Sequence, residues 1–326
     1  MTAPHTRLVD QRRPLGRSPV TVSRIGFGTA PLGGLYEELT DADAAAACAA
    51  AWDAGIRYFD TAPHYGAGLA ERRLGAFLAG RPRAEATVST KVGRLLVPGQ
   101  SAPGDFAFYG DQSLVRVRDY TEQGVYRSLA ESLERSGMDR FDVVLIHDPD
   151  DHWAAASEQA FPALARLRAE GAIGAIGVGM NQTAMLSRFV RETDVDCVMV
   201  AGRYSLLDRG ADDELLPLCA SRQVGVLVAG VFNSGILADP RPGAHYDYAP
   251  AAPSVLARAQ AMAARCAEFD VPLAAAALRF PLRHPTVTGI LLGLRSVAEV
   301  EAAQRHAEVD IPAELWAELE NWPPTD

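Results

Sequence analysis

The sequence lacks the features that would assign it to a membrane, to the secretory route or to nucleic acid. No apolar run approaches the roughly 20 residues of a membrane span, and residues 1–14 contain no apolar core of a secretory signal. Basic residues are outnumbered, with 31 Lys and Arg against 41 Asp and Glu and a formal net charge of -10. Phosphate backbones call for a basic face. We therefore expect a cytoplasmic protein with no membrane and no nucleic-acid partner.

Cysteine is scarce, and two common kinds of ligand motif are absent. The four cysteines fit no zinc or disulfide spacing, which favours buried thiols in a reducing compartment. Histidines and carboxylates do not cluster as a metal site requires, so no metal is expected. Gly26 and Gly28 do not continue into the G-x-G-x-x-G spacing of a dinucleotide-binding turn. The cysteines lie far apart, at Cys48, Cys197, Cys219 and Cys266.

What the sequence does contain is a regular alternation of short apolar segments and helical segments. Its 326 residues are 48% hydrophobic and 22% charged, the composition of a globular protein with a large core. No linker or composition shift divides the chain, so we predict a single (β/α)8 TIM barrel over residues 13–326. The alternative, a six-stranded doubly wound sheet, would leave two strands over. The eight predicted strands are residues 25–29, 57–60, 87–91, 142–147, 172–178, 196–200, 225–228 and 286–292.

Four further segments complete this prediction. Residues 1–12 are predicted to be a flexible extension, and residues 13–23, which contain Pro and Gly, a small N-terminal hairpin. Residues 92–119 and 229–253 are rich in Gly and Pro and are predicted to be long loops over the C-terminal face of the barrel. Helices are predicted between the strands, among them residues 157–169 and 211–222.

Polar residues stand at the C-terminal ends of three successive predicted strands. Asp60, Lys91 and His147 end these strands, and Tyr65 lies in the turn after Asp60. Barrels build their sites at this face, so the four side chains should converge. A tyrosine can act as a general acid, and a lysine ammonium beside it favours the phenolate. A carboxylate can orient the lysine, and a neutral histidine can polarise a carbonyl. Each residue alone has a structural explanation, but the combination predicts a catalytic group.

These motifs resemble those of the aldo-keto reductases over nearly the whole chain after Arg13. The resemblance implies an NAD(P)-dependent oxidoreductase that transfers hydride between CH–OH and carbonyl groups, with Tyr65 as general acid and base. Within the family, residues 147–152 and 201–208 are most similar to the aldose and L-fucose 1-dehydrogenase group, which implies oxidation of an L-fucose-like or D-threo-aldose-like hemiacetal to its lactone. The matching motifs are Gly26-Phe27-Gly28-Thr29, residues 58–66, Ser89-Thr90-Lys91-Val92-Gly93 and residues 145–150.

The resemblance also implies where a nicotinamide nucleotide, NAD or NADP, would bind. The phosphates are expected at the N-terminus of the helix that begins at Ser296, because helix N-termini bind anions. Glu299 stands where NADP-preferring members often carry arginine, which favours NAD, whereas Arg295 favours NADP; the balance leans to NAD. Met180 and Ala201 depart from the usual serine and glutamine. The predicted cofactor contacts are Gly28, Thr29, Asp60, Met180, Asn181, Tyr204, Asn233, Ser234, Gly235, Gly293, Arg295, Ser296 and Glu299.

The substrate is expected to be a small molecule, a sugar or another aldehyde or hemiacetal. Tyr36, His64 and Trp153 are candidate substrate contacts because they lie in predicted loops near the strand ends. Pyridoxal 4-dehydrogenase-like chemistry or general aldehyde and ketone reduction are alternatives within the same class. A cofactor-binding regulatory module is an alternative from another class, but such a module has no need of Lys91 beside Tyr65.

Overall fold

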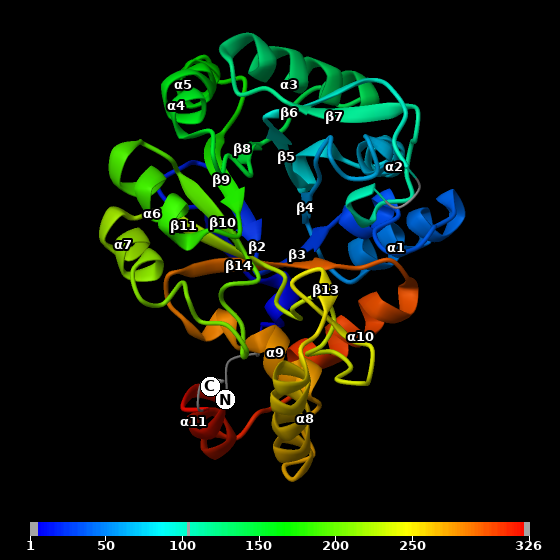
Figure 1. Ribbon diagram of the computed structural model, residues 1–326, viewed down its shortest axis with the longest axis vertical. Coiled ribbons are helices and arrows are strands. Elements are labelled where there is room, and N and C mark those ends of the chain that lie inside the picture. Colours follow the sequence, from blue (N-terminus) through cyan, green and yellow to red (C-terminus); the bar gives the residue numbers. More distant parts are fainter. Residues whose placement is uncertain (1–5, 103–104, 323–326) are drawn as a thin grey trace.

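The eight predicted strands form one closed parallel barrel (Figure 1). The structure is a computed structural model that describes residues 6–102 and 105–322. The last strand pairs with the first, with Ile290 opposite Ile25, and this pairing closes the sheet. The predicted (β/α)8 barrel is therefore confirmed. Round the barrel the strands follow chain order: β3 (Ile25–Gly28), β4 (Tyr58–Asp60), β5 (Thr87–Val92), β8 (Val143–His147), β9 (Ala175–Met180), β10 (Cys197–Ala201), β11 (Gly225–Ala229) and β14 (Val287–Gly293).

Helices surround the barrel on the outside (Figure 1). Thr40, Thr121 and Ser296 each begin a helix by accepting a hydrogen bond from the N–H three residues on, at 3.1–3.2 Å. None of the described helices is both long and apolar enough to cross a membrane. The longer helices are α1 (Asp41–Asp53), α2 (Leu69–Leu78), α3 (Glu122–Ser136), α5 (Phe161–Ala169), α6 (Thr183–Glu192), α7 (Leu215–Arg222), α8 (Pro253–Ala267), α9 (Leu273–Arg279), α10 (Val297–Glu308) and α11 (Ala313–Glu320).

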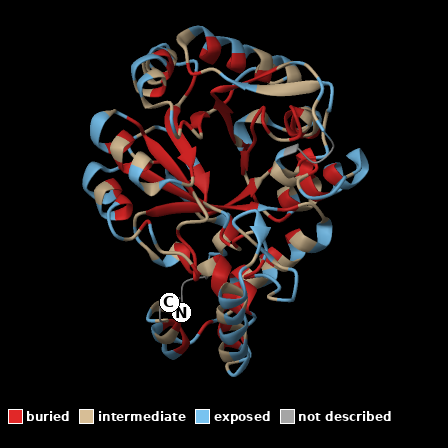
Figure 2. Cartoon of the chain, in the orientation of Figure 1, coloured by how far each residue is buried: buried red, intermediate tan, exposed pale blue. Residues whose placement is uncertain are grey.

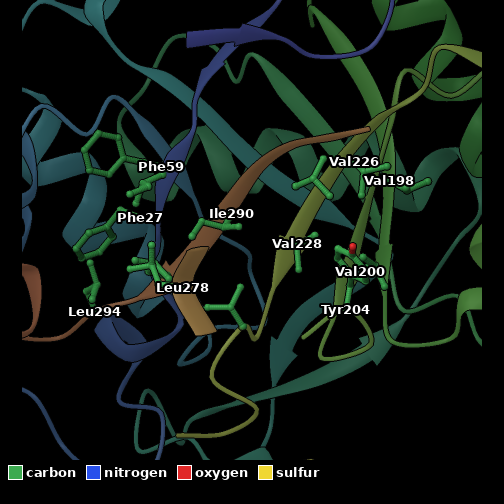
Figure 3. Packing of buried hydrophobic residues seen from close by; sticks show 14 of the residues in the cluster. Phe27, Phe59, Val198, Val200, Tyr204, Val226, Val228, Leu278, Ile290 and Leu294 are labelled. Atoms are coloured by element: carbon green, nitrogen blue, oxygen red, sulfur yellow. The ribbon is translucent and has the colours of Figure 1, made fainter. Parts of the chain in front are cut away.

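Alternate residues of each strand face the helices and the barrel interior, because successive side chains of a strand point to opposite sides of the sheet. The outward set, which includes Phe59 and Ile290, packs with the helices into the main core (Figure 3). The inward set, which includes Leu145 and Leu227, forms a second cluster inside the barrel. The strands are accordingly buried on both sides (Figure 2). This alternation decides which strand-end residues can reach the barrel mouth.

The predicted N-terminal hairpin closes the opposite end of the barrel. β1 (Arg12–Pro14) pairs antiparallel with β2 (Thr21–Ser23). Leu15 and Val22 are fully buried and belong to the inner cluster, so the hairpin plugs the barrel from below. Of the extension predicted at residues 1–12, residues 1–5 lie outside the described residues. The 3-10 turn Leu8–Asp10 buries Val9 in the main core, so the packed chain begins before residue 13.

Several predicted boundaries are wrong. Residues 92–119 are not all loop, because β6 (Arg94–Pro98) and β7 (Leu114–Arg118) form an antiparallel hairpin. The Val-Arg alternation of β7 is the strand signal that the Gly and Pro content concealed. Residues 229–253 likewise contain the short pair β12 (His245–Tyr246) and β13 (Ala249–Pro250). The helix expected at 157–169 starts earlier, with α4 (Trp153–Ala155) and a π-helical turn at Ala156–Ala160 before α5, and α7 starts at Leu215 rather than at residue 211.

Candidate active site

Lys91 lies at the centre of a buried hydrogen-bonded cluster at the C-terminal ends of β4 and β5. Its Nζ donates to Asp60 Oδ2 at 2.6 Å, to the Tyr65 hydroxyl at 2.9 Å and to the Thr61 carbonyl at 3.0 Å. Asp60 Oδ1 accepts a further hydrogen bond from Ser89 Oγ at 2.7 Å. The Lys91 and Asp60 side chains are only 2% and 3% exposed, so water does not screen the pair. The structure thus brings together three of the four residues predicted to be catalytic.

Burial sets the protonation states of this cluster. Burial raises the pKa of Tyr65, and the opposing effect of the Lys91 ammonium does not cancel it. As expected, the Lys91 ammonium favours the phenolate, but in the protein alone desolvation of the phenolate outweighs this effect on the pKa of Tyr65. Burial also works against the charge of Lys91, but Asp60 and Tyr65 outweigh it and raise the pKa of the ammonium. A protonated phenol beside a charged lysine is the resulting arrangement.

Close backbone packing holds the turn that carries Tyr65. Gly66 has a φ of +60°, a conformation that glycine adopts without a steric penalty. A Cβ atom on Gly33 would lie 2.6 Å from the Gly66 nitrogen, and one on Gly110 would lie 2.1 Å from the Gly66 oxygen. Two loops therefore press directly on the turn, and only glycine fits at their points of contact. This packing fixes the Tyr65 ring over Lys91, whose Nζ is 4.5 Å from the ring centroid.

His147 faces the same cluster from the end of β8. Its ring centroid is 6.0 Å from that of Tyr65, with the two rings nearly perpendicular. Burial, reinforced by the charges of Lys91 and Arg94, holds the pKa of His147 well below its usual range. A neutral imidazole can donate one hydrogen bond and accept another. His147 can therefore hold a substrate oxygen beside Tyr65 without adding a charge.

The three predicted substrate contacts have different surroundings. His64 is buried among aromatic rings, with the centroids of Phe108 and His147 at 5.3 and 5.6 Å. Burial lowers the pKa of His64 to about 2, so it is neutral. Tyr36 is 39% exposed in the loop after β3. Trp153 is not in a loop: it starts α4, and its ring packs against Phe189 and Arg188 of α6. Its contact with substrate stays a prediction.

The strand alternation separates the predicted cofactor contacts into two groups. Met180 packs in the main core between the barrel and the helices, so its side chain does not face the mouth. Asn181, the next residue, is half-buried and does not belong to that core. Tyr204 lies beside Val200 in the same core (Figure 3), with the Phe280 ring 5.3 Å away. The predicted contacts through the side chains of Met180 and Tyr204 are therefore wrong.

Other predicted cofactor residues lie at the ends of β3 and β14 and in the turn after β11, where some polar atoms lack partners among the described residues. Gly28 and Gly293 lie opposite each other at the ends of β3 and β14. Thr29 Oγ1 and Asn233 Oδ1 are buried and have no hydrogen-bond partner among the described residues, which is rare for a buried polar atom. Ser234 Oγ accepts from the Tyr248 N–H at 3.0 Å, and the space around a Cβ on Gly235 is empty. These residues fit a polar ligand such as a nicotinamide nucleotide.

The predicted phosphate end of the site contains a charge cluster. Ser296 caps α10, and Glu299 Oε2 accepts from the Arg295 N–H at 2.9 Å. The Arg295 guanidinium is 2.8 Å from Glu299 Oε1 and 2.6 Å from Glu37 Oε1. Arg295 is thus already paired with two carboxylates, and the local charge is negative.

Three residues near the tetrad were not predicted from the sequence. Arg94 Nη2 donates to Asp148 Oδ2 at 2.6 Å directly beside His147. Tyr248, at the tip of the β12–β13 hairpin, is 60% exposed, and the phenol of Tyr65 acts on it electrostatically. The hairpin tip is fixed by a 2.5 Å ion pair between Asp247 and Arg203. Asp148 directly follows His147, and Arg94 lies three residues after Lys91. These positions close to predicted catalytic residues were the sequence feature that could have identified both.

Two curated relatives cover almost the whole chain. A D-threo-aldose 1-dehydrogenase from a Pseudomonas species is 46% identical over 92% of this chain and 94% of its own length. A pyridoxal 4-dehydrogenase from Microbacterium luteolum is 42% identical over 95% of this chain and 96% of its own length. Together with the barrel and its polar cluster, these relatives define the chain as an NAD(P)-dependent oxidoreductase.

A family model and a solved structure both match nearly the whole chain. A sequence model described as the aldo/keto reductase family matches residues 24–322. The solved holo structure of an aldo-keto reductase from Bacillus halodurans superposes with a TM-score of 0.77 and 25% identity, and covers 97% of both chains. The chain belongs to the aldo/keto reductase family.

Proposed function

We propose that the chain is an aldose 1-dehydrogenase that oxidises the C1 hemiacetal of a sugar to a lactone. The observation that carries this proposal is the Asp60–Lys91–Tyr65 cluster with a neutral His147 beside it at the end of the neighbouring strand. The relative at 46% identity is named for the same reaction class. Four free, buried cysteines support a reducing compartment such as the cytoplasm.

Oxidation of a hemiacetal removes a hydride from C1 and a proton from the C1 hydroxyl. A bound nicotinamide nucleotide supplies the hydride acceptor. Tyr65 is the residue placed to exchange the proton, because its hydroxyl is 2.9 Å from Lys91 Nζ and the ammonium stabilises the phenolate. His147 hydrogen-bonds the same substrate oxygen. Since burial raises the pKa of Tyr65, oxidation should accelerate as the pH rises, whereas carbonyl reduction uses the protonated phenol directly.

Pyridoxal oxidation is the second candidate, and an aromatic wall favours it. Phe106, which is 63% exposed, lies edge-on to His64 with ring centroids 5.3 Å apart. Phe108 stacks on Tyr65 at 5.9 Å. Such a wall suits a planar pyridine ring, and it also suits the C–H face of a sugar. General aldehyde and ketone reduction does not require such an aromatic wall.

A spectrophotometric screen tests the proposal. Reduced nucleotide formation is followed with D-threo-aldoses, L-fucose and pyridoxal in the presence of NAD or NADP, and its consumption is followed with simple aldehydes. We expect the largest kcat/KM with an aldose and NAD. A larger value with pyridoxal would transfer the assignment to the second candidate. A protein that binds the nucleotide tightly but turns over no substrate would indicate a regulatory module.

A further inference from the structure

Asp148 occupies a strained and tightly fixed position next to the tetrad. Its φ is +43°, in the left-handed region that few non-glycine residues adopt. The Asp148 N–H donates to the Gly179 carbonyl at 3.0 Å. The Tyr120 hydroxyl contacts the carbonyl oxygens of both His147 and Asp148, at 2.7 and 2.6 Å. Strain that the surroundings maintain in this way is characteristic of functional positions.

The carboxylate of Asp148 is only half satisfied. Oδ2 accepts from Arg94 Nη2 at 2.6 Å and lies 3.5 Å from His147 Nε2. Oδ1 accepts no hydrogen bond from the residues that the structure describes, and the side chain is 26% exposed. Burial raises the pKa of Asp148, and the Arg94 guanidinium opposes that rise. Arg94 is itself 9% exposed and is held against the carboxylate.

The carboxylate of Asp148 lies next to the reacting group. Its Oδ2 is 3.5 Å from His147 Nε2, and the His147 ring centroid is 6.0 Å from that of Tyr65, so the carboxylate belongs to the same mouth. An ionised carboxylate can only accept hydrogen bonds, and therefore selects ligand groups that donate them. If His147 holds the oxygen on the reacting carbon, Asp148 next to it is placed to receive the hydroxyl of the neighbouring carbon.

We propose that Asp148 is a specificity-determining residue that accepts a hydrogen bond from the substrate hydroxyl on the carbon next to the reacting one, with Arg94 orienting the carboxylate. The inference rests on the proposed function in so far as the substrate is polyhydroxylated. It narrows that function to substrates with a hydroxyl beside the oxidised or reduced carbon. A site built to hydrogen-bond a substrate hydroxyl discriminates against an analogue that lacks it, because the polar group of the site is then left without its partner.

The test compares an aldose with its 2-deoxy counterpart in wild type and in Asp148→Asn. Asparagine keeps the size and can still accept from Arg94, but it carries no charge. We expect wild type to prefer the 2-hydroxy sugar, and the ratio of the two kcat/KM values to fall about ten- to a hundredfold in the variant, as for loss of a hydrogen bond to a charged group. An equal loss for both sugars would assign Asp148 a structural role and overturn the proposal.

Two further measurements keep the result unambiguous. Asp150→Asn removes a nearby carboxylate, which accepts from Gln182 Nε2 at 2.8 Å and has no part in the proposal, so it should leave the ratio unchanged. If Asp148→Asn does not fold, the wild-type preference alone decides, because equal kcat/KM for the two sugars contradicts the proposal. If wild type oxidises no sugar, the proposed function fails, but reduction of glyceraldehyde against propionaldehyde still tests Asp148 through the same ratio.

Discussion

The two sides of the barrel mouth are built from opposite kinds of residue. On one side, β4, β5 and β8 end inward with Asp60, Lys91 and His147. On the other side, five strands end inward with small residues, which are Gly179, Ala201, Ala229, Gly293 and Gly28. On the charged side hydrogen bonds hold Asp60 and Lys91 in place, whereas the small side leaves room for a ligand. Chemistry and ligand accommodation are therefore separate properties of one ring of strand ends, and substitutions should separate them experimentally.

The largest expected effect is the loss of turnover when the proton-transfer group of Tyr65 is removed. In Tyr65→Phe the ring still packs in the turn, but the hydroxyl that Lys91 contacts is lost. We expect turnover to fall about a hundred- to ten-thousandfold, while nucleotide affinity changes little. Steady-state kinetics and a fluorescence titration with NADH measure the two effects. Wild-type-like turnover in a folded Tyr65→Phe protein would remove Tyr65 from the mechanism.

A larger side chain on the small side should lower nucleotide affinity and leave the catalytic cluster in place. Leucine at Ala201 would project from the end of β10 into the mouth, so we expect nucleotide affinity to fall about tenfold or more. The Asp60–Lys91–Tyr65 cluster is not touched by this change. Met180→Leu is the matched control, because Met180 faces the helices and its substitution should leave nucleotide affinity unchanged. Equal nucleotide affinity in wild type and Ala201→Leu would show that the small residues do not make room for the cofactor.

The two buried histidines at the mouth, His64 and His147, should also make the stability of the protein depend on pH. Burial lowers the pKa of His64 to about 2 and that of His147 well below 6.5, so the unfolded chain binds more protons than the folded chain once the pH falls below 6.5. The stabilisation is complete above that pH and is lost as the pH falls towards the folded-state values. Each histidine should lower the free energy of unfolding by up to about 1.4 kcal/mol per pH unit.

Urea unfolding at several pH values below neutrality measures this slope. His64→Gln should reduce the slope, and His245→Gln, which removes an exposed histidine, is the matched control. A slope that His64→Gln leaves unchanged would mean that His64 does not remain neutral in the folded protein.

The rim of the small side should show the smallest effect, a change in cofactor preference. Arg295 is paired with Glu299 and Glu37, so a 2′-phosphate would meet net negative charge there. We expect NAD to be preferred over NADP, and Glu299→Arg to shift the ratio of kcat/KM values several-fold towards NADP, as for exposed charges. If wild type prefers NADP, or if the variant leaves the ratio unmoved, Glu299 does not select the cofactor.

The sequence predicted the charged side better than the small side for a physical reason. Asp60, Lys91 and His147 are unusual residues for strand ends, and their spacing places them in consecutive units of the barrel. Small residues carry no such signal, since glycine and alanine occur everywhere. Which side of a strand a residue faces also depends on register. That is why Met180 and Tyr204 were expected at the mouth but lie in the outer core.

Loop geometry was the other feature that the sequence concealed. The β6–β7 hairpin brings Arg94 to Asp148, and the β12–β13 hairpin brings Tyr248 to the mouth; both depend on contacts between residues far apart in the chain. The balance of burial against charge at Tyr65 also requires coordinates, because desolvation cannot be read from neighbouring residues in sequence. The type of chemistry was therefore predictable, whereas the wall that selects the substrate was not.

The most direct test of this account follows the hydrogen on C1 of an aldose. The enzyme is incubated with NAD and a sugar deuterated at C1, and the nucleotide and the sugar product are analysed by NMR and mass spectrometry. The account predicts one lactone for each reduced nucleotide, with the deuterium on the nicotinamide ring. A reduced nucleotide without the label, or oxidation at a carbon other than C1, would contradict it.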